Sequence, residues 1–378
     1  MSDLVEPFEV SVDDATIADL RDPLARTRWP DQPNGVGWDL GTDRDALQAL
    51  CEHWRERFDW SAFVERCNRF PQHTTTVDGQ RIDFIHARSP EAGARPLLLA
   101  HGWPGSVAEF FDVIGPLADP VAHGGSADDA FHVVVPSLPG YGFSGPTSEL
   151  GWNIERTAQA FGEVMARLGY DRYFTQGGDW GSFVAPAMAR AHPDRVAGVH
   201  VNLAVAGPPA DGPTDEETAI AGRMGAFAAT ESGYQAIQGT KPQTLAYGLT
   251  DSPAGLAGWI LEKFHGWSGA DGDQRFSVDR LLDNITIYWL TGTINSSMRM
   301  YYEMRQPAAA ASLGAAPANV PLGVGRYPDE PFTVPRRWIE EALHPGYIGE
   351  AAEGGHFAAM QVPDLFVDDI RACFRTIG

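Results

Sequence analysis

The fold of this 378-residue chain is decided by the stretch Tyr173-Phe174-Thr175-Gln176-Gly177-Gly178-Asp179-Trp180-Gly181-Ser182. An apolar strand runs into glycines on both sides of Asp179, and a helical segment, Phe183 to Ala191, follows. Such glycines let the chain turn sharply and lift the acidic side chain above the end of a parallel sheet, as in a nucleophile elbow with Asp in place of Ser. A carboxylate nucleophile forms an ester with an alkyl carbon, so we expect displacement at carbon. The alternative is a junction in which Asp179 only caps the helix.

The composition narrows the classes of function. A formal net charge of -22 argues against binding to nucleic acid or to anionic membranes, because both need a basic patch. Three cysteines, Cys51, Cys67 and Cys373, are odd in number and lack metal-ligand spacing, so neither a disulfide framework nor a metal site is expected. The acidic start is unlike a signal peptide, and no apolar run approaches the roughly 18 residues of a membrane span. We therefore expect a soluble cytoplasmic protein.

The pattern along the chain predicts four parts. Residues 1–92 form an N-terminal extension with helical signals at Asp13 to Arg26 and Asp43 to Arg57, then a hairpin turning at Asp78-Gly79. Residues 93–205 alternate short apolar strands with helices, at Pro96 to Ala100, Phe131 to Val135, Tyr173 to Gln176 and Val199 to Leu203. This alternation is typical of an α/β fold with a mostly parallel central sheet and helices on both faces.

The alternation of strands and helices is interrupted in the second half of the chain and then resumes. Residues 206–319 contain helical runs, Ala254 to Phe264 and Asp279 to Tyr301, without a clear core strand, and are expected to form a helical lid. Residues 320–378 complete the core with a strand before Gly325, another at Tyr347 to Glu350 and an end helix from Pro363 to Thr376.

One glycine-rich segment resembles a dinucleotide-binding fingerprint. Gly140 to Gly145 matches Gly-x-Gly-x-x-Gly after a strand. Pro139 and Pro146 flank it, however, and the next helical pattern begins only near Ile154. A tight loop is the better interpretation.

Partners for Asp179 appear in the order nucleophile, acid, histidine that an α/β-hydrolase uses. His356 lies in a glycine loop after the last predicted strand, and Asp329 and Glu330 lie in the loop after the preceding strand. Each could instead be an incidental loop residue, and the pattern alone does not separate the two acids. His101-Gly102-Trp103-Pro104 follows a strand where this architecture supplies an oxyanion-hole N–H. The backbone N–H groups of Trp103 and Trp180 are then the expected oxyanion hole, the alternative being a structural turn with a buried tryptophan.

At this point the chain resembles a known family, the epoxide hydrolases of the α/β-hydrolase superfamily, and within it the microsomal type with its soluble bacterial relatives. The resemblance covers nearly the whole chain, N-terminal extension included. It is carried by His101-Gly102-Trp103-Pro104-Gly105-Ser106, Gly177-Gly178-Asp179-Trp180-Gly181-Ser182 and Gly354-Gly355-His356-Phe357-Ala358-Ala359. Matching segments in the predicted lid are Glu231-Ser232-Gly233-Tyr234, Thr240-Lys241-Pro242, Asp251-Ser252-Pro253 and Tyr288-Trp289-Leu290-Thr291-Gly292-Thr293-Ile294, which leads to Tyr301.

The resemblance implies a role for each of these residues. Asp179 is the nucleophile, His356 the base that activates water, and Glu330, which follows Tyr327-Pro328-Asp329, the orienting acid. Tyr234 and Tyr301 are the lid tyrosines that hold the epoxide oxygen. Ordinary packing is the alternative for both tyrosines, and Tyr302 is a rival for the second position.

The implied reaction converts a small hydrophobic epoxide and water to a vicinal diol, as in detoxification, with no metal or other cofactor. The membrane anchor of the microsomal enzymes is missing from this sequence, so membrane association is not carried over. The oligomeric state stays open, with a homodimer among the options. Two other readings are a haloalkane dehalogenase, which also attacks with Asp but needs no lid tyrosines, and a catalytically silent binding member of the fold.

Overall fold

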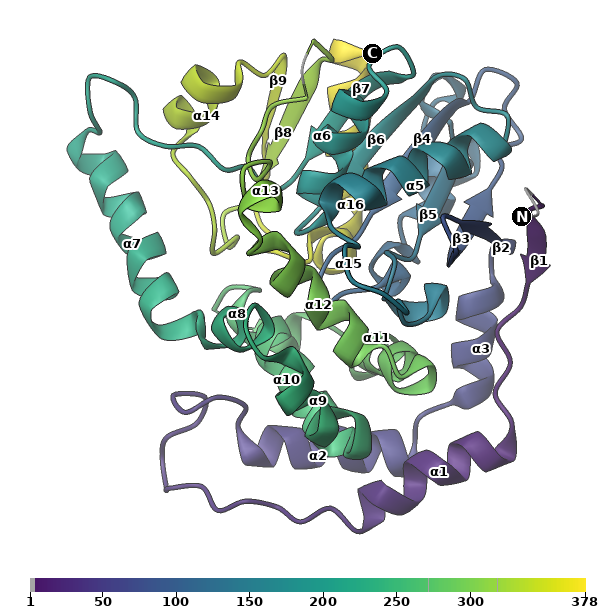
Figure 1. Cartoon of the computed structure of the whole chain (residues 1–378), viewed down its shortest axis with the longest axis vertical. Coiled ribbons are helices and arrows are strands. Elements are labelled where there is room, and N and C mark those ends of the chain that lie inside the picture. Colours follow the sequence, from purple (N-terminus) through teal and green to yellow (C-terminus); the bar gives the residue numbers. More distant parts are fainter. Residues whose placement is uncertain (1–3, 271, 318) are drawn as a thin grey trace.

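A nine-stranded sheet forms the centre of the computed structural model, which describes residues 4–270, 272–317 and 319–378 (Figure 1). The strand order is β1-β2-β3-β5-β4-β6-β7-β8-β9. Six neighbouring strands run parallel, namely β5, β4, β6, β7, β8 and β9. Strands β1, β2 and β3 add an antiparallel edge next to β5. The mostly parallel sheet predicted from the sequence is therefore confirmed. The strands are β1 Glu6–Phe8, β2 Gln72–Val77, β3 Gln80–Ala87, β4 Arg95–Ala100, β5 Phe131–Pro136, β6 Tyr173–Gly177, β7 Val196–Val201, β8 Leu322–Arg326 and β9 Tyr347–Glu350.

Helices cover both faces of the sheet, as the side chains of β6 show. Phe174 packs on Phe374 of α16 with ring centroids 4.5 Å apart, whereas the hydroxyl of Thr175 reaches the carbonyl oxygen of Ala185 in α6. Successive strand residues point to opposite faces, so α16 and α6 lie on opposite sides. The helices around the sheet are α4 Ile114–Ala118, α5 Ile154–Arg167, α6 Gly181–Ala191, α14 Arg336–Leu343, α15 Ala358–Gln361 and α16 Pro363–Ile377.

Between β7 and β8 the chain forms a group of helices beyond one end of the sheet (Figure 1). The single helical run predicted from Asp279 to Tyr301 is wrong in one respect, because the structure has two helices there. Gly292 ends the first helix in the left-handed conformation, with φ 60°, which favours glycine and stops a helix. The helices of this insert are α7 Asp215–Glu231, α8 Gly233–Gln238, α9 Pro242–Asp251, α10 Pro253–Gly266, α11 Val278–Thr291, α12 Ile294–Met304 and α13 Pro307–Ala310.

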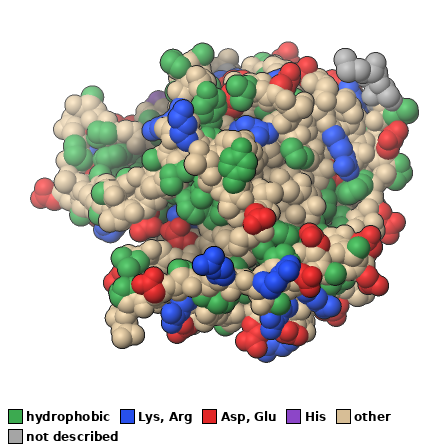
Figure 2. Space-filling view, turned by 60° about the horizontal axis from the view of Figure 1, so that its bottom comes forward, with side chains coloured by type: hydrophobic (Ala, Val, Ile, Leu, Met, Phe, Trp, Pro, Cys, Tyr) green, Lys and Arg blue, Asp and Glu red, His purple; other side chains and the backbone are tan. Residues whose placement is uncertain are grey.

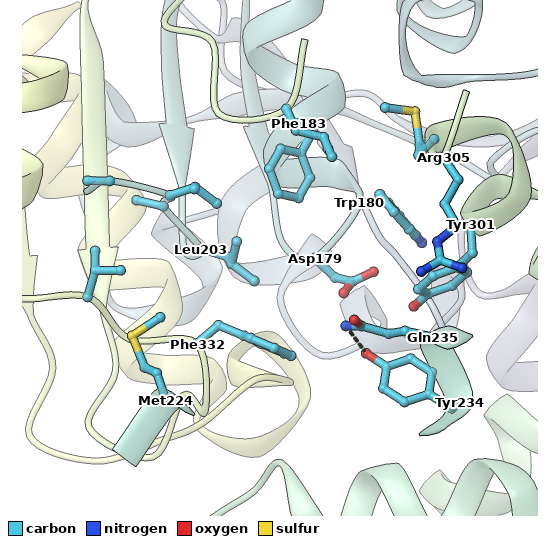
Figure 3. Close-up of a pocket in the computed structure, with 16 residues that line it drawn as sticks. Asp179, Trp180, Phe183, Leu203, Met224, Tyr234, Gln235, Tyr301, Arg305 and Phe332 are labelled. Atoms are coloured by element: carbon cyan, nitrogen blue, oxygen red, sulfur yellow. Dashed lines mark hydrogen bonds between the residues drawn. The ribbon is translucent and has the colours of Figure 1, made fainter. Parts of the chain in front are cut away.

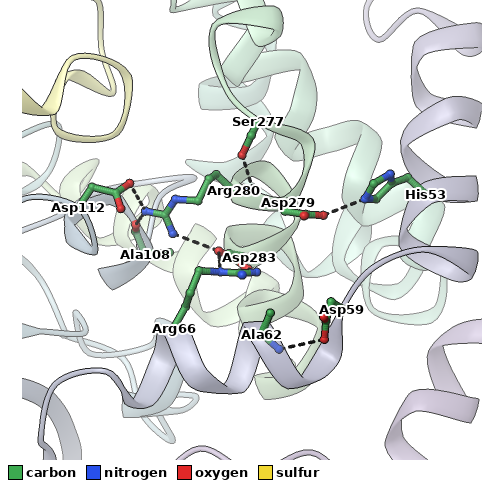
Figure 4. Close-up of polar contacts among 10 residues, drawn as sticks. All are labelled: His53, Asp59, Ala62, Arg66, Ala108, Asp112, Ser277, Asp279, Arg280 and Asp283. Carbon is green, nitrogen blue, oxygen red and sulfur yellow. Dashed lines mark hydrogen bonds and ion pairs between the residues drawn. The ribbon is translucent and has the colours of Figure 1, made fainter.

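The N-terminal helices α1 Asp14–Ala25, α2 Arg44–Glu56 and α3 Trp60–Asn68 pack against this insert (Figure 1). Figure 4 shows the polar contacts that join them to α11. Arg66 of α3 donates two hydrogen bonds of 2.7 Å to the fully buried carboxylate of Asp283. Arg280 contacts the same carboxylate at 3.1 Å and Asp112 at 2.7 Å. Asp283 thus joins α3 to α11, and Arg280 joins α11 to the core at Asp112.

Two turn predictions agree with the structure. Strands β2 and β3 pair across Asp78 and Gly79, both at positive φ, as a tight hairpin requires. The segment Gly140 to Gly145 is a loop containing only the short 3-10 helix η4 Gly142–Ser144. The other 3-10 helices are η1 Val107–Phe110, η2 Val121–His123, η3 Ala127–Asp129 and η5 Gly272–Arg275.

The surface carries both signs of charge. Figure 2 shows acidic and basic side chains interspersed over one face. Within the described ranges, no helix combines the length and the apolar character needed to cross a bilayer.

Candidate active site

Asp179 occupies a sharp turn between β6 and α6. Its φ is 49°, which is unusual for a residue with a side chain and lifts the carboxylate away from the strand. The turn also needs close approach of the backbone at two glycines. A Cβ on Gly181 would overlap the carbonyl oxygen of Ala100, and a Cβ on Gly102 would overlap the Asp179 carboxylate. These overlaps explain why glycine is required next to this acid.

Each oxygen of the Asp179 carboxylate has its own contact. The backbone N–H of Trp103 donates a hydrogen bond of 2.8 Å to Oδ1. Nε2 of His356 lies 3.3 Å from Oδ2. Trp180 is the N-cap of α6, and the first N–H groups of a helix lack intrahelical partners. The Trp103 amide therefore contacts the carboxylate, and the Trp180 amide lies at the start of α6, directly after Asp179.

The structure distinguishes the two neighbouring acids that the sequence pattern alone left open. Glu330 accepts from Nδ1 of His356 at 2.9 and 3.1 Å, and both side chains are buried. Asp329 points elsewhere and accepts a hydrogen bond of 2.9 Å from Arg275. The order Asp179, His356, Glu330 therefore forms one continuous chain of polar contacts.

His356 favours its protonated form in this environment. Burial lowers its pKa, but the negative charges and contacts of Glu330 and Asp179 outweigh burial and raise the pKa to about 10. Glu109 of η1 is a third acidic group near the pair. Burial raises the pKa of Glu109 to about 8, although the charge of His356 opposes this shift. The contacts of His356 with Glu330 and Asp179 thus favour the protonated imidazole.

Tyr234 of α8 and Tyr301 of α12 face the nucleophile across a cavity (Figure 3). Their rings lie 5.7 Å apart in an edge-to-face arrangement. Trp103 stacks on Tyr234 at 5.3 Å, and Trp180 packs against Tyr301 at 4.7 Å. Burial is the largest cause that raises the pKa of both tyrosines, so both hydroxyls keep their protons at neutral pH. Tyr302 is absent from the described lining of this cavity.

The cavity has a volume of about 380 Å³ and is mainly apolar. Asp179 and Arg305 are its charged lining residues, and Gln235 adds a polar amide. A site of this kind suits a small apolar molecule that is held by a few polar groups. The apolar lining residues are Trp180, Phe183, Leu203, Ala204, Val205, Ala206, Met224, Met304, Leu313, Phe332 and Val334.

Two polar residues at the site were not predicted individually. His101 is buried, and burial lowers its pKa to about 4, so it is neutral. It contacts the Gly102 carbonyl oxygen through Nδ1 and accepts from the Leu138 N–H through Nε2, which supports the loop before Trp103. The sequence signal for His101 was its place at the start of the motif His101-Gly102-Trp103-Pro104. Gln235 donates to the Tyr234 hydroxyl at 2.9 Å, a contact for which the sequence carries no signal.

Comparison with known proteins identifies the family. Residues 5–110 match the family model described as epoxide hydrolase N terminus, and residues 95–229 match the model for the alpha/beta hydrolase fold. A putative epoxide hydrolase from Stigmatella aurantiaca is 44% identical over 99% of this chain and 85% of that protein. Epoxide hydrolase 1 from Sus scrofa is 37% identical over 97% of this chain and 88% of that protein.

Solved structures agree with the sequence relatives. The juvenile hormone epoxide hydrolase of the silkworm Bombyx mori has a TM-score of 0.88 at 30% identity, covering 98% of this chain and 94% of that chain. The epoxide hydrolase of Aspergillus niger also has a TM-score of 0.88 at 30% identity, covering 99% and 97%. The predicted α/β-hydrolase fold is therefore confirmed, and the chain belongs to the epoxide hydrolases of that superfamily, hydrolases that act on epoxides.

Proposed function

We propose that this enzyme converts epoxides to vicinal diols through a covalent ester on Asp179. One observation carries the proposal. The Asp179 carboxylate is held between the Trp103 N–H and His356, at a cavity that two protonated tyrosines share. A nucleophile, a base and two acids thus surround one space that fits a small molecule.

In the first step Oδ2 of Asp179 attacks a ring carbon of the epoxide. Oδ1 is bound to the Trp103 N–H and becomes the carbonyl oxygen of the ester. The carbon–oxygen bond of the ring breaks, and the epoxide oxygen takes the electron pair and a proton from Tyr234 or Tyr301. A positioned general acid typically contributes about 10²- to 10⁴-fold in rate. The two hydroxyls can share one oxygen because both face it from the insert.

In the second step water attacks the carbonyl carbon of the ester. Alkylation neutralises Asp179 and so removes one of the two carboxylates that hold the proton on His356. The pKa of His356 then falls, and its proton passes to the tyrosinate left by ring opening. The neutral ring, which Glu330 keeps oriented, can then take a proton from water through Nε2. The N–H groups of Trp103 and Trp180 stabilise the oxyanion. The tetrahedral intermediate collapses as the departing alkoxide takes this proton from His356 and leaves as the diol. The Asp179 carboxyl group then returns its own proton to His356, which restores the carboxylate.

The apolar lining supports a small hydrophobic epoxide as substrate. A relative named juvenile hormone epoxide hydrolase, from Bombyx mori, is among the proteins similar to this chain. The detoxification role, the cytoplasmic location and a homodimer stay predictions from the sequence.

A labelling experiment tests the covalent step. A single turnover of an aryl epoxide in water labelled with heavy oxygen should place one heavy oxygen in the peptide that contains Asp179, because water attacks the ester carbonyl. Asp179→Ala should form no diol. Label found only in the diol would show direct attack by water and would refute the ester. Release of chloride from a chloroalkane at a comparable rate would instead favour dehalogenation.

A further inference from the structure

Gln235 follows Tyr234 in α8, and both side chains line the cavity beside Asp179 (Figure 3). Nε2 of Gln235 donates a hydrogen bond of 2.9 Å to the hydroxyl oxygen of Tyr234. Neighbouring residues of a helix do not normally face each other, so this contact requires both side chains to bend into the same space. The amide therefore belongs to the surroundings of the Tyr234 hydroxyl and not to the outer surface of the helix.

The direction of this hydrogen bond decides where the tyrosine proton goes. A phenol has one proton to donate and accepts through its oxygen. Because Gln235 occupies an acceptor site, the Tyr234 proton is left to point at another acceptor. The cavity opposite holds the Asp179 carboxylate, and it is the place where the epoxide oxygen would lie. The amide thus keeps the proton available to a substrate.

We propose that Gln235 is a positioning residue for ring opening, which directs the Tyr234 proton to the epoxide oxygen. The inference rests on the proposed function, in which Tyr234 is a proton donor. As the bond from Asp179 to carbon forms and the ring carbon–oxygen bond breaks, the epoxide oxygen receives the electron pair and the proton of Tyr234. Negative charge then develops on the phenol oxygen, 2.9 Å from the Gln235 amide nitrogen.

A hydrogen bond to a charged oxygen is stronger than one to a neutral hydroxyl. The amide therefore stabilises the transition state more than the bound epoxide, and only such a difference accelerates the step. Other charges also act on Tyr234. Burial and the carboxylates of Asp179 and Glu330 raise its pKa, whereas the hydrogen bonds from Gln235 and Tyr301 lower it. The ammonium group of Lys263 lies 4.5 Å from the centroid of the Tyr234 ring. At the hydroxyl oxygen itself, Gln235 donates a hydrogen bond of 2.9 Å, and the Tyr301 hydroxyl is a second hydrogen-bond partner.

The test is the alkylation rate of Gln235→Met, measured by rapid quench with styrene oxide in single turnover. Methionine keeps the length of the side chain but has no N–H. Loss of a hydrogen bond to a charged group predicts alkylation slower by about 10- to 100-fold. Hydrolysis of the Asp179 ester and the dissociation constant of the epoxide should be unchanged, which a damaged fold would not allow. Gln243→Met, on the exposed face of α9, makes the same chemical change away from the cavity and should alkylate at the wild-type rate.

A double-mutant cycle with Tyr234→Phe shows whether the amide acts through the tyrosine. Adding Gln235→Met to Tyr234→Phe should cause no further loss, since the hydroxyl that it positions is gone. Three outcomes would each overturn the inference. They are a full additional loss in the Tyr234→Phe background, wild-type alkylation in Gln235→Met, and faster alkylation in Gln235→Met. The last would mean that the amide oxygen competes for the Tyr234 proton. Wild-type alkylation in Tyr234→Phe itself would refute the donor role of Tyr234 in the proposed function. The two failures are therefore distinguishable.

If the first variant does not fold, Gln235→Leu repeats the test with a different shape. The two tyrosines are also predicted to contribute unequally to the alkylation rate, because the Gln235 amide contacts Tyr234. Tyr234→Phe should slow alkylation more than Tyr301→Phe, and the double variant should lose alkylation. A smaller loss in Tyr234→Phe than in Tyr301→Phe would contradict the inference.

Discussion

Replacing Glu330 by Gln removes a negative charge from the two contacts, 2.9 and 3.1 Å long, that hold His356 through Nδ1. The charge of Glu330 is the largest of the influences that raise the pKa of His356. We therefore expect the pKa of His356 to fall in Glu330→Gln. A glutamine can also donate a hydrogen bond to Nδ1, which would leave the imidazole proton on Nε2. Nε2 could then no longer accept a proton from water.

The structure sets the size of the effect. Two unit charges about 3 Å apart interact by roughly 5 to 6 kcal/mol at an effective dielectric constant of about 20. Each 1.36 kcal/mol lost in the transition state slows a step by about tenfold, so the full interaction gives an upper limit of about 10⁴-fold. The same acid-to-amide change in a Ser-His-Asp triad costs about 10⁴-fold. We expect ester hydrolysis to be slower by about 10³- to 10⁴-fold, with alkylation largely retained.

The assay is rapid quench followed by intact-protein mass spectrometry. Glu330→Gln should accumulate enzyme whose mass is increased by that of the epoxide, because the ester forms but is not hydrolysed. Asp329→Asn is the matched control, since it makes the same change one residue away, in a side chain that contacts Arg275. Rapid turnover in Glu330→Gln together with ester accumulation in Asp329→Asn would refute the assignment of the orienting acid.

Two further predictions concern stability. Asp283→Asn removes the charge shared by Arg66 and Arg280, and we expect the free energy of unfolding in urea to fall by about 2 to 3 kcal/mol. This is less than the roughly 3 to 5 kcal/mol lost when a fully buried pair is broken, because the Arg66 side chain is 28% exposed. A loss near zero would show that the contact does not stabilise the fold. The pKa of His356 is raised in the fold to about 10 from 6.5, so its proton stabilises the fold fully below pH 6.5 and this contribution is lost as pH rises through about 10. The difference in Tm between wild type and His356→Gln should shrink over that range, and a difference that grows with pH would contradict the raised pKa.

Much of the core could be predicted because its signals are local. The apolar strand before Gly177 and the glycines beside Asp179 indicate the turn within a few residues of sequence. The hairpin at Asp78 and Gly79 is local in the same way. Where a helical pattern continued across Gly292, the sequence predicted one helix and the structure has two. A glycine inside a periodic pattern can be tolerated or can end a helix, and packing decides between the two.

The sequence by itself determined the order of the reactive residues and, through the motifs around Asp179 and His356, the family. The sequence pattern did not separate Asp329 from Glu330, because they are adjacent and share the same chemistry. The resemblance implied Glu330, and the tertiary structure brings Glu330 into contact with His356. Arg275, which is 54 residues from Asp329 in the chain, binds that acid and leaves Glu330 to the histidine. The contact of Gln235 with Tyr234 was equally hidden, since it depends on a cavity that forms only when the insert packs over the sheet. Local turns follow from backbone sterics within a few residues, whereas the pairing of side chains follows from long-range packing that no single segment encodes.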